Sequence, residues 1–285
     1  MIPTPAANEI ARNVRDALRE DLGAIGRDYT AELINAECIA TATLISREAG
    51  VLCGQAWVNE VFQQLGGKVE LTWHKAEGDV IAADDILLTM TGPARSILTG
   101  ERTAMNLLQT LSGTATVTSQ YAEQLHDSTC QLLDTRKTIP GLRLAQKYAV
   151  AVGGGHNHRI GLFDAFLIKE NHIAAAGSIA QAVRNARQLN SDLKLEVEVE
   201  TLAELEQAIA AKVDVIMLDN FSLTMMTEAV TLVRALDASI KLEASGDVTL
   251  ETLATIATTG VDYISVGALT KHVRALDLSL RVNVQ

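Results

Sequence analysis

The sequence predicts an α/β protein in which short aliphatic strands alternate with amphipathic helices. Hydrophobic residues make up 48% of the chain but aromatic residues only 4%, so the apolar side chains are mainly those of Ala, Val, Leu and Ile. That composition is typical of buried parallel strands. In the second half of the chain, strand-like and helix-like segments alternate, and one strand follows the previous strand after ~20–35 residues. This pattern favours right-handed βαβ units and a parallel sheet.

The first hundred residues are expected to form a separate α+β unit. An amphipathic helix is predicted within residues 1–21, because Ile10, Val14 and Leu18 recur at every fourth position with charges between them. Apolar residues at every second position predict strands, and apolar residues at every third or fourth position predict helices. The further elements expected, in order, are a strand at 36–46, a helix at 56–65, a strand at 68–76, a strand turning helical near Pro93 within 79–98, and helices at 101–111 and 114–125.

Six short strands are expected from Cys130 onward, each ending in polar residues: 130–137, 165–171, 194–200, 214–220, 240–246 and 262–268. Helical patterns lie between the later strands, at 178–189, 201–211, 226–236 and 249–260. Because there are six strands and not eight, the sheet is either an incomplete barrel or an open doubly wound sheet. In both architectures, active-site residues gather at the carboxyl ends of the strands.

Composition also excludes several classes of protein. A formal net charge of -11 argues against general nucleic-acid binding. No apolar run approaches the roughly 20 residues that a membrane-spanning helix needs, and the N-terminal segment lacks the apolar core of a signal peptide. The three cysteines, Cys38, Cys53 and Cys130, are odd in number and form no CxxC pair. We therefore expect neither disulfides nor structural zinc, and a cytoplasmic location.

The window from Asp134 to His172 is basic although the chain as a whole is acidic. Its cations are Arg136, Lys137, Arg143, Lys147, Arg159 and Lys169. Cations gathered around a glycine-rich segment indicate a site for a small polyanion, bound through charge-assisted hydrogen bonds. The alternative is an ordinary solvated charged face. The glycine loop GGGHNHR (153–159) has neither dinucleotide-binding nor Walker A spacing, and its histidines lack the spacing of a zinc site.

Polar residues end the predicted strands, and parallel strands would place them at one edge of the sheet. They are Arg136 and Lys137, Lys169, Glu198, Asp219, Ser245 with Gly246, and Gly267. In the run 195–200, acidic residues alternate on one face of the strand, where burial is costly unless they are paired or bind a metal. Together Glu198 and Asp219 suit either Mg²⁺ or the two hydroxyls of a ribose. The glycine turns after the last two strands suit a phosphate.

Several long motifs closely resemble the quinolinate phosphoribosyltransferase family. They are LLDTRKTIPGLRLAQKYAVAVGGGHNHRIGLFDAFLIKENH (132–172), EVEVETLAEL (196–205), IMLDNFS (216–222), LEASGDV (242–248), GVDYISVGALT (260–270) and ERTAMNLLQTLSGTAT (101–116). The resemblance covers most of the chain from about residue 100 and, more loosely, the N-terminal unit. The segment DLGAIGRDYTAELI (21–34) departs from the pattern of the family but lies outside the expected site.

The resemblance implies the fold and reaction of a type II phosphoribosyltransferase. It implies an N-terminal open-faced α/β sandwich, residues 1–112, which the tail 272–285 completes, and an incomplete, six-stranded α/β barrel, residues 113–271. It implies that phosphoribosyl pyrophosphate (PRPP) and quinolinate react with Mg²⁺ to give nicotinate mononucleotide, pyrophosphate and carbon dioxide, in NAD biosynthesis. It also implies a homodimer or larger assembly, with each barrel mouth completed by the partner's N-terminal domain.

The site residues that the resemblance implies fall into two groups. The ring dicarboxylate would be bound by Arg136, His158, Arg159 and Lys169, with Arg102 contributed by the other subunit. PRPP would be bound by Lys137, Glu198, Asp219, Ser245, Gly246, Asp247, Val266, Gly267 and Ala268, and Thr135 is a further expected substrate-binding residue. Lys137, Glu198 and Asp219 are the expected catalytic residues, and the two carboxylates are also the expected metal ligands, directly or through substrate or water.

Two other functions stay open from the sequence. One is a related phosphoribosyltransferase acting on nicotinate or another ring carboxylate, although a mono-acid needs fewer cations than this window holds. The other is a non-catalytic barrel that binds phosphate ligands. Arg143, Lys147, His156 and His172 have no role in any of these interpretations.

Overall fold

The computed structural model describes residues 5–284; residues 1–4 of the expected first domain and Gln285 of the expected tail lie outside the described residues. Contacts within the chain divide it into two compact units. The first unit contains the residues up to Ser119, the segment Thr138–Gly154 and the residues from Leu269 onward. The second contains Gln120–Lys137 and Gly155–Ala268. Each unit is therefore built from segments that are distant in sequence.

The first unit contains a four-stranded antiparallel sheet in the order β12-β1-β5-β3. These strands are β1 (Ile39–Ser46), β3 (Glu70–Trp73), β5 (Ile86–Pro93) and β12 (Leu278–Val284), and β2 (Gly50–Val51) pairs separately with β4 (Val80–Ile81). Alternate residues of β1, namely Ala40, Ala42 and Leu44, are buried in the core. This alternation is what a strand with one core-facing side requires.

Helices of the first unit pack their apolar stripes into the same core. They are α1 (Ala7–Leu22), α2 (Gln55–Gln64), α4 (Arg143–Val152) and most of α3 (Ala94–Glu123), with a short 3₁₀ turn at Ala31–Leu33. The two helices expected at 101–111 and 114–125 are one continuous helix, α3. Gly113, in the middle of α3, has no room for a side chain, because a Cβ there would lie 2.1 Å from the carbonyl oxygen of Arg274.

The second unit contains the predicted parallel sheet of six strands, in the order β6-β11-β10-β9-β8-β7. The strands are β6 (Gln131–Leu133), β7 (Ala165–Ile168), β8 (Lys194–Val199), β9 (Val215–Asp219), β10 (Lys241–Ser245) and β11 (Tyr263–Ser265). The two end strands, β6 and β7, do not pair with each other in the described part of the chain. The sheet is thus an incomplete barrel, one of the two architectures that the strand count left open.

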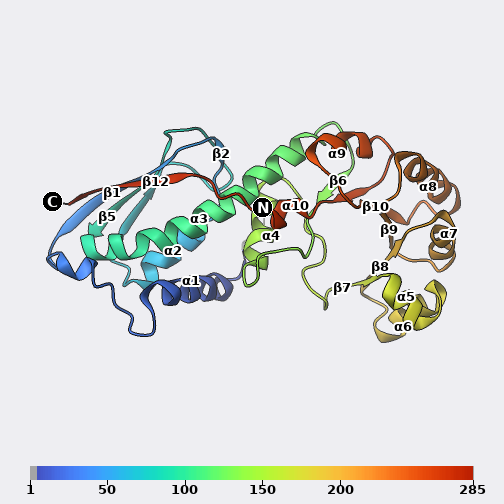
Figure 1. The fold of residues 1–285 in the computed structure, drawn as a ribbon, viewed down its shortest axis with the longest axis horizontal. Coiled ribbons are helices and arrows are strands. Elements are labelled where there is room, and N and C mark those ends of the chain that lie inside the picture. The colour runs from blue at the N-terminus through green and yellow to red at the C-terminus, as the bar shows by residue number, and fades with distance from the viewer. Residues whose placement is uncertain (1–4, 285) are drawn as a thin grey trace. The chain divides into compact units, whose positions relative to one another are not determined.

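Helices cover the outer face of this sheet, as Figure 1 shows. They are α5 (Glu170–Ala176), α6 (Ile179–Leu189), α7 (Leu202–Ala210), α8 (Leu223–Leu236) and α9 (Leu250–Ala257), and α10 (Ala268–Lys271) follows β11. The helices begin close to the carboxyl ends of the strands. For α6, α7 and α8 the first turn is capped by Ser178, Thr201 and Ser222, whose side-chain oxygens each accept a backbone N–H.

The inner face of the second sheet carries acidic residues, while the outer face is aliphatic. In β8, Leu195, Val197 and Val199 are fully buried, and the alternate residues Glu196 and Glu198 are buried as well. The register places Glu198, Met217 and Glu243 side by side across β8, β9 and β10. Since neighbouring residues in register point to the same side of a sheet, Glu243 shares the inner face with Glu198.

Within residues 5–284, no helix combines the length and apolar character needed to cross a lipid bilayer. All three cysteines of the chain are free thiols. Burial raises the pKa of the Cys130 thiol to about 12, and the nearby Asp262 adds to the shift. That cysteine is accordingly a packing residue in its protonated form.

Candidate active site at the carboxyl edge of the parallel sheet

Lys169 and Glu198 form an ion pair at the carboxyl ends of β7 and β8. Glu198 is almost completely buried, whereas the ammonium side of the pair is about half exposed. Burial raises the pKa of the Glu198 carboxyl, Lys169 lowers it, and the neighbouring charge of Asp219 raises it again. The three groups therefore interact electrostatically, as expected if strand ends bring them into one mouth.

Asp219 ends β9, and the next residue, Asn220, contacts its carboxylate. Asn220 donates its side-chain amide to Asp219 Oδ2 at 3.0 Å, and its backbone N–H to the carbonyl of Ser245 at 3.0 Å. The cap of the following helix is Ser222, so Asp219 has no capping function. A carboxylate at a strand end that caps no helix is a candidate for ligand binding.

The turn Ser245–Gly246–Asp247 lies directly beside Asn220. Gly246 has φ +104°, and a Cβ there would lie 2.1 Å from Asn220 Oδ1. Asp247 also has a positive φ, of 40°, and is exposed. Only glycine combines this backbone conformation with such close contact. The turn is therefore a close-packed backbone loop of the kind that can present N–H groups to a phosphate.

The second glycine turn, Val266–Gly267–Ala268, lies beside Thr135 and Lys137, which follow β6. A Cβ on Gly267 would lie 3.0 Å from Lys137 Cδ and 3.7 Å from Thr135 Oγ1. Thr135 Oγ1 accepts the backbone N–H of Lys137 at 3.1 Å, and the N–H of Val266 donates to the Leu133 carbonyl at 2.9 Å. Lys137 is exposed and Val266 is buried. The predicted pyrophosphate lysine and the predicted phosphate turn thus lie side by side.

Arg136 and Arg159 influence each other electrostatically. Burial and the positive charge of Arg136 both lower the pKa of the Arg159 guanidinium, while the acidic groups of Glu196 and Asp164 raise it. The Nε atom of Arg136 is buried and has no hydrogen-bond partner. Two close cations, of which Arg136 has an unused donor, favour a bound anion, because an anion relieves both the repulsion and the missing hydrogen bond.

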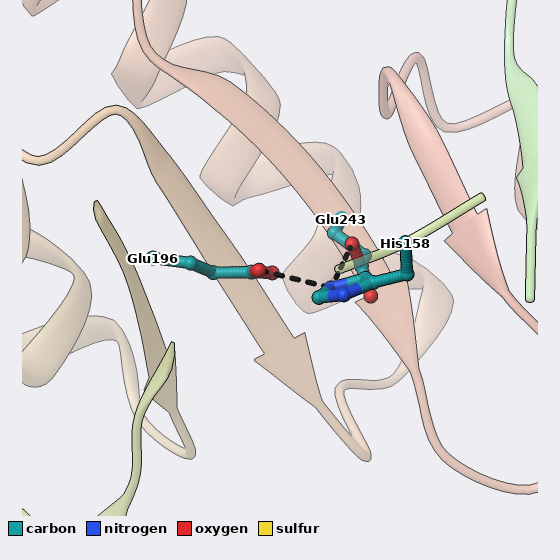
Figure 2. A group of neighbouring side chains, drawn as sticks. All are labelled: His158, Glu196 and Glu243. Atoms are coloured by element: carbon teal, nitrogen blue, oxygen red, sulfur yellow. Dashed lines mark ion pairs between the residues drawn. The ribbon is translucent and has the colours of Figure 1, made fainter. Parts of the chain in front are cut away.

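His158 is held inside the barrel by two buried glutamates, as Figure 2 shows. Its Nε2 lies 2.9 Å from Glu196 Oε2 and 3.4 Å from Glu243 Oε2. Burial lowers the pKa of the imidazole, but the two carboxylates outweigh burial and raise it. Burial and the charge of Glu243 raise the pKa of Glu196 to about 7, against the lowering effect of His158. The carboxylates therefore favour a proton on Nε2 at neutral pH, whereas the backbone N–H of Arg159, which faces Nδ1, opposes a second proton on the ring.

The loop that carries His158 is anchored to the end of β6. Asp134, fully buried, accepts the His158 N–H on Oδ1 at 2.9 Å and the Asn157 side-chain amide on Oδ2 at 2.7 Å. The backbone of His156 forms a short parallel bridge with Leu133. Asp164 accepts two further backbone N–H groups of the loop, at 2.7 and 2.9 Å. Carboxylates thus fix the glycine-rich loop on both sides of His158 and Arg159.

The predicted site residues are divided between the two units. Thr135, Lys137 and Val266–Ala268 lie at one end of the edge, and Lys169, Glu198, Asp219 and Ser245–Asp247 at the next strand ends. Arg102 is exposed on α3, in the first unit. Of the residues without an expected role, Arg143 and the buried Lys147 belong to α4 in the first unit, and His172 accepts the Lys169 N–H at the start of α5.

Glu243, Asp134 and Asn220 were missed as site residues from the sequence. Glu243 could have been found, because it lies two residues before Ser245 in the same strand and therefore faces the same side of the sheet. Asp134 and Asn220 could not have been found from the sequence, since their importance depends on loops and turns that reach them from other parts of the chain.

Comparison with known proteins agrees with the geometry over nearly the whole chain. Residues 28–112 match the model of the quinolinate phosphoribosyl transferase N-terminal domain, and residues 114–281 match that of the C-terminal domain. A probable carboxylating nicotinate-nucleotide pyrophosphorylase of Bacillus subtilis is 43% identical over 266 residues, covering 93% of this chain and 90% of the relative. A decarboxylating quinolinate phosphoribosyltransferase of Nicotiana tabacum is 40% identical over 288 residues, covering 94% of this chain and 81% of the relative.

Solved structures give the same result for the fold. The nicotinate-nucleotide pyrophosphorylase of Francisella tularensis is 49% identical, with a TM-score of 0.94 and 99% of each chain covered. Human nicotinic acid phosphoribosyltransferase, at 14% identity and a TM-score of 0.64, shares the fold. The matches to both family models, the identity to full-length relatives and the arrangement of strands together show that the chain belongs to the quinolinate phosphoribosyltransferase family.

Proposed function

We propose that the protein transfers the phosphoribosyl group of PRPP to quinolinate with loss of carbon dioxide, in NAD biosynthesis. The products are nicotinate mononucleotide, pyrophosphate and carbon dioxide. The observation that carries the proposal is the family match over both domains, and the chemistry of the carboxyl edge agrees with it. Cations lie beside two carboxylates and two glycine turns, which is the set of groups that a dicarboxylate and a phosphorylated ribose require.

The ring dicarboxylate suits the cations around Arg136 and Arg159. Planar guanidinium groups match carboxylates in a bidentate manner, and the buried unpartnered Nε of Arg136 offers one such donor. Lys169 adds a third cation at the end of β7. We propose that His158 and, from a second subunit, Arg102 complete this group. His158 has partners on both ring nitrogens within the barrel, so it would contribute through the residues that it contacts.

PRPP suits the remaining groups of the edge. We propose that Lys137 and Thr135 bind the pyrophosphate, with Gly267 leaving room for the lysine chain. The turns Ser245–Asp247 and Val266–Ala268 would bind phosphate through backbone N–H groups. Glu198 and Asp219 would hold the ribose hydroxyls, because both are carboxylates at neighbouring strand ends.

The same two carboxylates fit Mg²⁺ by their chemistry. Asp219 raises the pKa of Glu198, so the two negative charges repel each other, and hard oxygen donors are the ligands that Mg²⁺ prefers. We propose that Glu198 and Asp219 hold the ion, directly or through substrate hydroxyls and water. When bound there, Mg²⁺ would neutralise charge on the leaving pyrophosphate.

The protein groups would act mainly by electrostatics. Displacement at the anomeric carbon passes through a cation-like ribose while negative charge grows on pyrophosphate. Lys137 would stabilise the pyrophosphate, and the carboxylates of Glu198 and Asp219 would stabilise the ribose. Once the ring nitrogen is alkylated, its positive charge stabilises the electron pair that the departing carboxylate leaves on the adjacent ring carbon. The protein needs to hold the ring while carbon dioxide departs and a proton replaces it.

We also propose a homodimer with shared active sites and a cytoplasmic location. The shared site follows from the family resemblance of Arg102, and the location from three free thiols. A mixing experiment tests the first point. Heterodimers of Arg102→Ala and Lys137→Ala protomers contain one site in which both residues are intact, so the activity of the heterodimer should return to about half that of the wild-type dimer. Verified heterodimers without recovered activity would contradict the shared site.

The reaction itself is tested by product analysis with a matched pair of variants. Wild-type protein with PRPP, Mg²⁺ and quinolinate carrying ¹⁴C in the carboxyl group next to the ring nitrogen should release labelled carbon dioxide and form nicotinate mononucleotide. Glu198→Gln should lower kcat by about 100-fold or more, on the scale of other electrostatic catalytic groups. Glu200→Gln is the control, because Glu200 follows in the same acidic run but is exposed. Turnover of nicotinate as fast as quinolinate, without carbon dioxide release, would contradict the assignment.

A further inference from the structure

The cluster of His158, Glu196 and Glu243 has the donor set of a cation site. One nitrogen and two carboxylate oxygens lie within 4.8 Å of one another, and Oε1 of each glutamate is buried without a hydrogen-bond partner. Both glutamates are almost fully buried, with 4% and 1% of their surfaces exposed. Such buried acidic oxygens are costly to retain, so they are expected to have a function.

The hydrogen bond on the other side of the imidazole argues against a metal ion. Nδ1 of His158 accepts the backbone N–H of Arg159 at 2.8 Å. A nitrogen that accepts a hydrogen bond carries no proton, so the ring proton lies on Nε2, and Nε2 has no lone pair for a metal. The Nε2–H group instead points at Glu196 and Glu243. The imidazole therefore links the floor of the barrel to the backbone of Arg159.

Arg159 occupies a special position in the anchored loop. The residue before it is tied to Asp134 through its N–H, and the two residues after it are tied to Asp164 through theirs. The N–H of Arg159 itself donates to the imidazole. Its guanidinium reaches the carbonyl of Ala165 at 3.5 Å and lies close enough to Arg136 to be affected by its charge.

We propose that Glu243, together with Glu196, is a positioning residue for binding of the ring dicarboxylate. The two glutamates fix the tautomer and orientation of His158, and His158 Nδ1 in turn fixes the backbone of Arg159 beneath the substrate carboxylates. Glu243 touches no substrate and acts through the imidazole. This inference rests on the proposed function, because it takes Arg159 to be a quinolinate ligand.

A kinetic comparison of two variants tests the proposal. Glu243→Gln keeps an oxygen that accepts the Nε2–H bond, whereas Glu243→Leu removes it. We expect Glu243→Leu to raise KM for quinolinate by about tenfold or more, since a small misplacement of a binding group is costly, while KM for PRPP stays within about twofold. Glu243→Gln should restore most of the quinolinate affinity. Equal rises in both KM values, no rise for Glu243→Leu, or a glutamine variant as poor as the leucine variant would overturn the proposal.

A second measurement does not depend on any Glu243 variant and covers the case in which Glu243→Leu fails to fold. Nitrogen NMR of wild-type protein labelled at histidine should show His158 with an unprotonated Nδ1 and a protonated Nε2, assigned by comparison with His158→Gln. A protonated Nδ1 would overturn the proposed chain of contacts. A wild-type protein that does not convert quinolinate would refute the proposed function, whereas an active protein with the wrong tautomer refutes only the positioning role.

Discussion

Replacing Gly246 by alanine is expected to destabilise the second unit strongly, for two separable reasons. The backbone at Gly246 has φ +104°, a conformation that costs an alanine about 1–2 kcal/mol. The new Cβ would also lie 2.1 Å from Asn220 Oδ1 and 2.7 Å from its Cγ, and relieving such overlap typically costs about 1–3 kcal/mol. The sum is about 3 kcal/mol, or about 10 °C in Tm at ~2–4 °C per kcal/mol.

A matched control separates the two contributions. Gly177, in the same unit, has φ +89°, but a Cβ there would meet nothing within 4 Å. Gly177→Ala should therefore lose only the backbone contribution of about 1–2 kcal/mol. Adding Asn220→Gly to Gly246→Ala should recover part of the loss, because it removes the clashing amide at a residue whose own φ is +56°.

The assay is thermal and urea unfolding followed by circular dichroism, with all four proteins measured in the same buffer. The order of stability should be wild type, Gly177→Ala, the double variant and Gly246→Ala. Equal losses for the two single alanine variants would refute the reasoning, since the contact with Asn220 would then have no energetic effect. Failure of Asn220→Gly to improve Gly246→Ala would refute it as well.

Three further changes have distinct expected outcomes. Gly267→Ala, whose Cβ would lie 3.0 Å from Lys137 Cδ, should displace that flexible chain and lower kcat about tenfold, with Tm changed by no more than about 2 °C; unchanged kcat would contradict this. Burial alone would raise the pKa of Asp262. Hydrogen bonds from the Leu242 N–H, Arg234 and Lys241 outweigh burial, so the pKa lies below the usual value of 3.8 for an aspartate. The stabilisation from ionised Asp262 is therefore present above about pH 4 and is lost as pH falls through the folded pKa. Asp262→Asn should accordingly destabilise the protein most at pH 7, and its effect should shrink as the pH is lowered through that pKa, as a series of urea titrations at decreasing pH would show. Thr201→Ala, which removes the cap of α7, should cost about 1 kcal/mol in the same titrations.

Most of the second unit could be predicted from local sequence patterns. Each of its strands is a short aliphatic run with polar residues at the end, and such runs signal buried parallel strands without help from distant contacts. Strand ends were less predictable. The segment 130–137 was expected to be one strand, but β6 stops at Leu133 because Asp134 turns its carboxylate toward the glycine loop. The break expected within α3 was wrong because Gly113 is required by a contact with Arg274, not by a turn.

The residues of the candidate site likewise divide into those that local sequence patterns predict and those that depend on distant contacts. Lys169, Glu198, Asp219 and Gly246 could be placed together from the rule that parallel strands end at one edge. The contacts that support these residues could not be predicted, because they depend on His158, a loop residue that contacts Glu196 of β8 and Glu243 of β10. Histidine spacing carries no information on such a contact, since its partners come from strands far along the chain. Direct binding roles for the individual residues stay predictions until substrate complexes are compared.

The pairing of β12 with β1 has a consequence for synthesis of the chain. β1 is complete early, but the strand that covers one of its edges ends at residue 284. Every strand of the second unit lies between residues 131 and 265, so that sheet can assemble while the first still has an open edge. An open edge strand is a template for pairing with other chains. Loss of β12, by truncation or stalled translation, should therefore produce aggregation through the first unit while the parallel sheet is already folded.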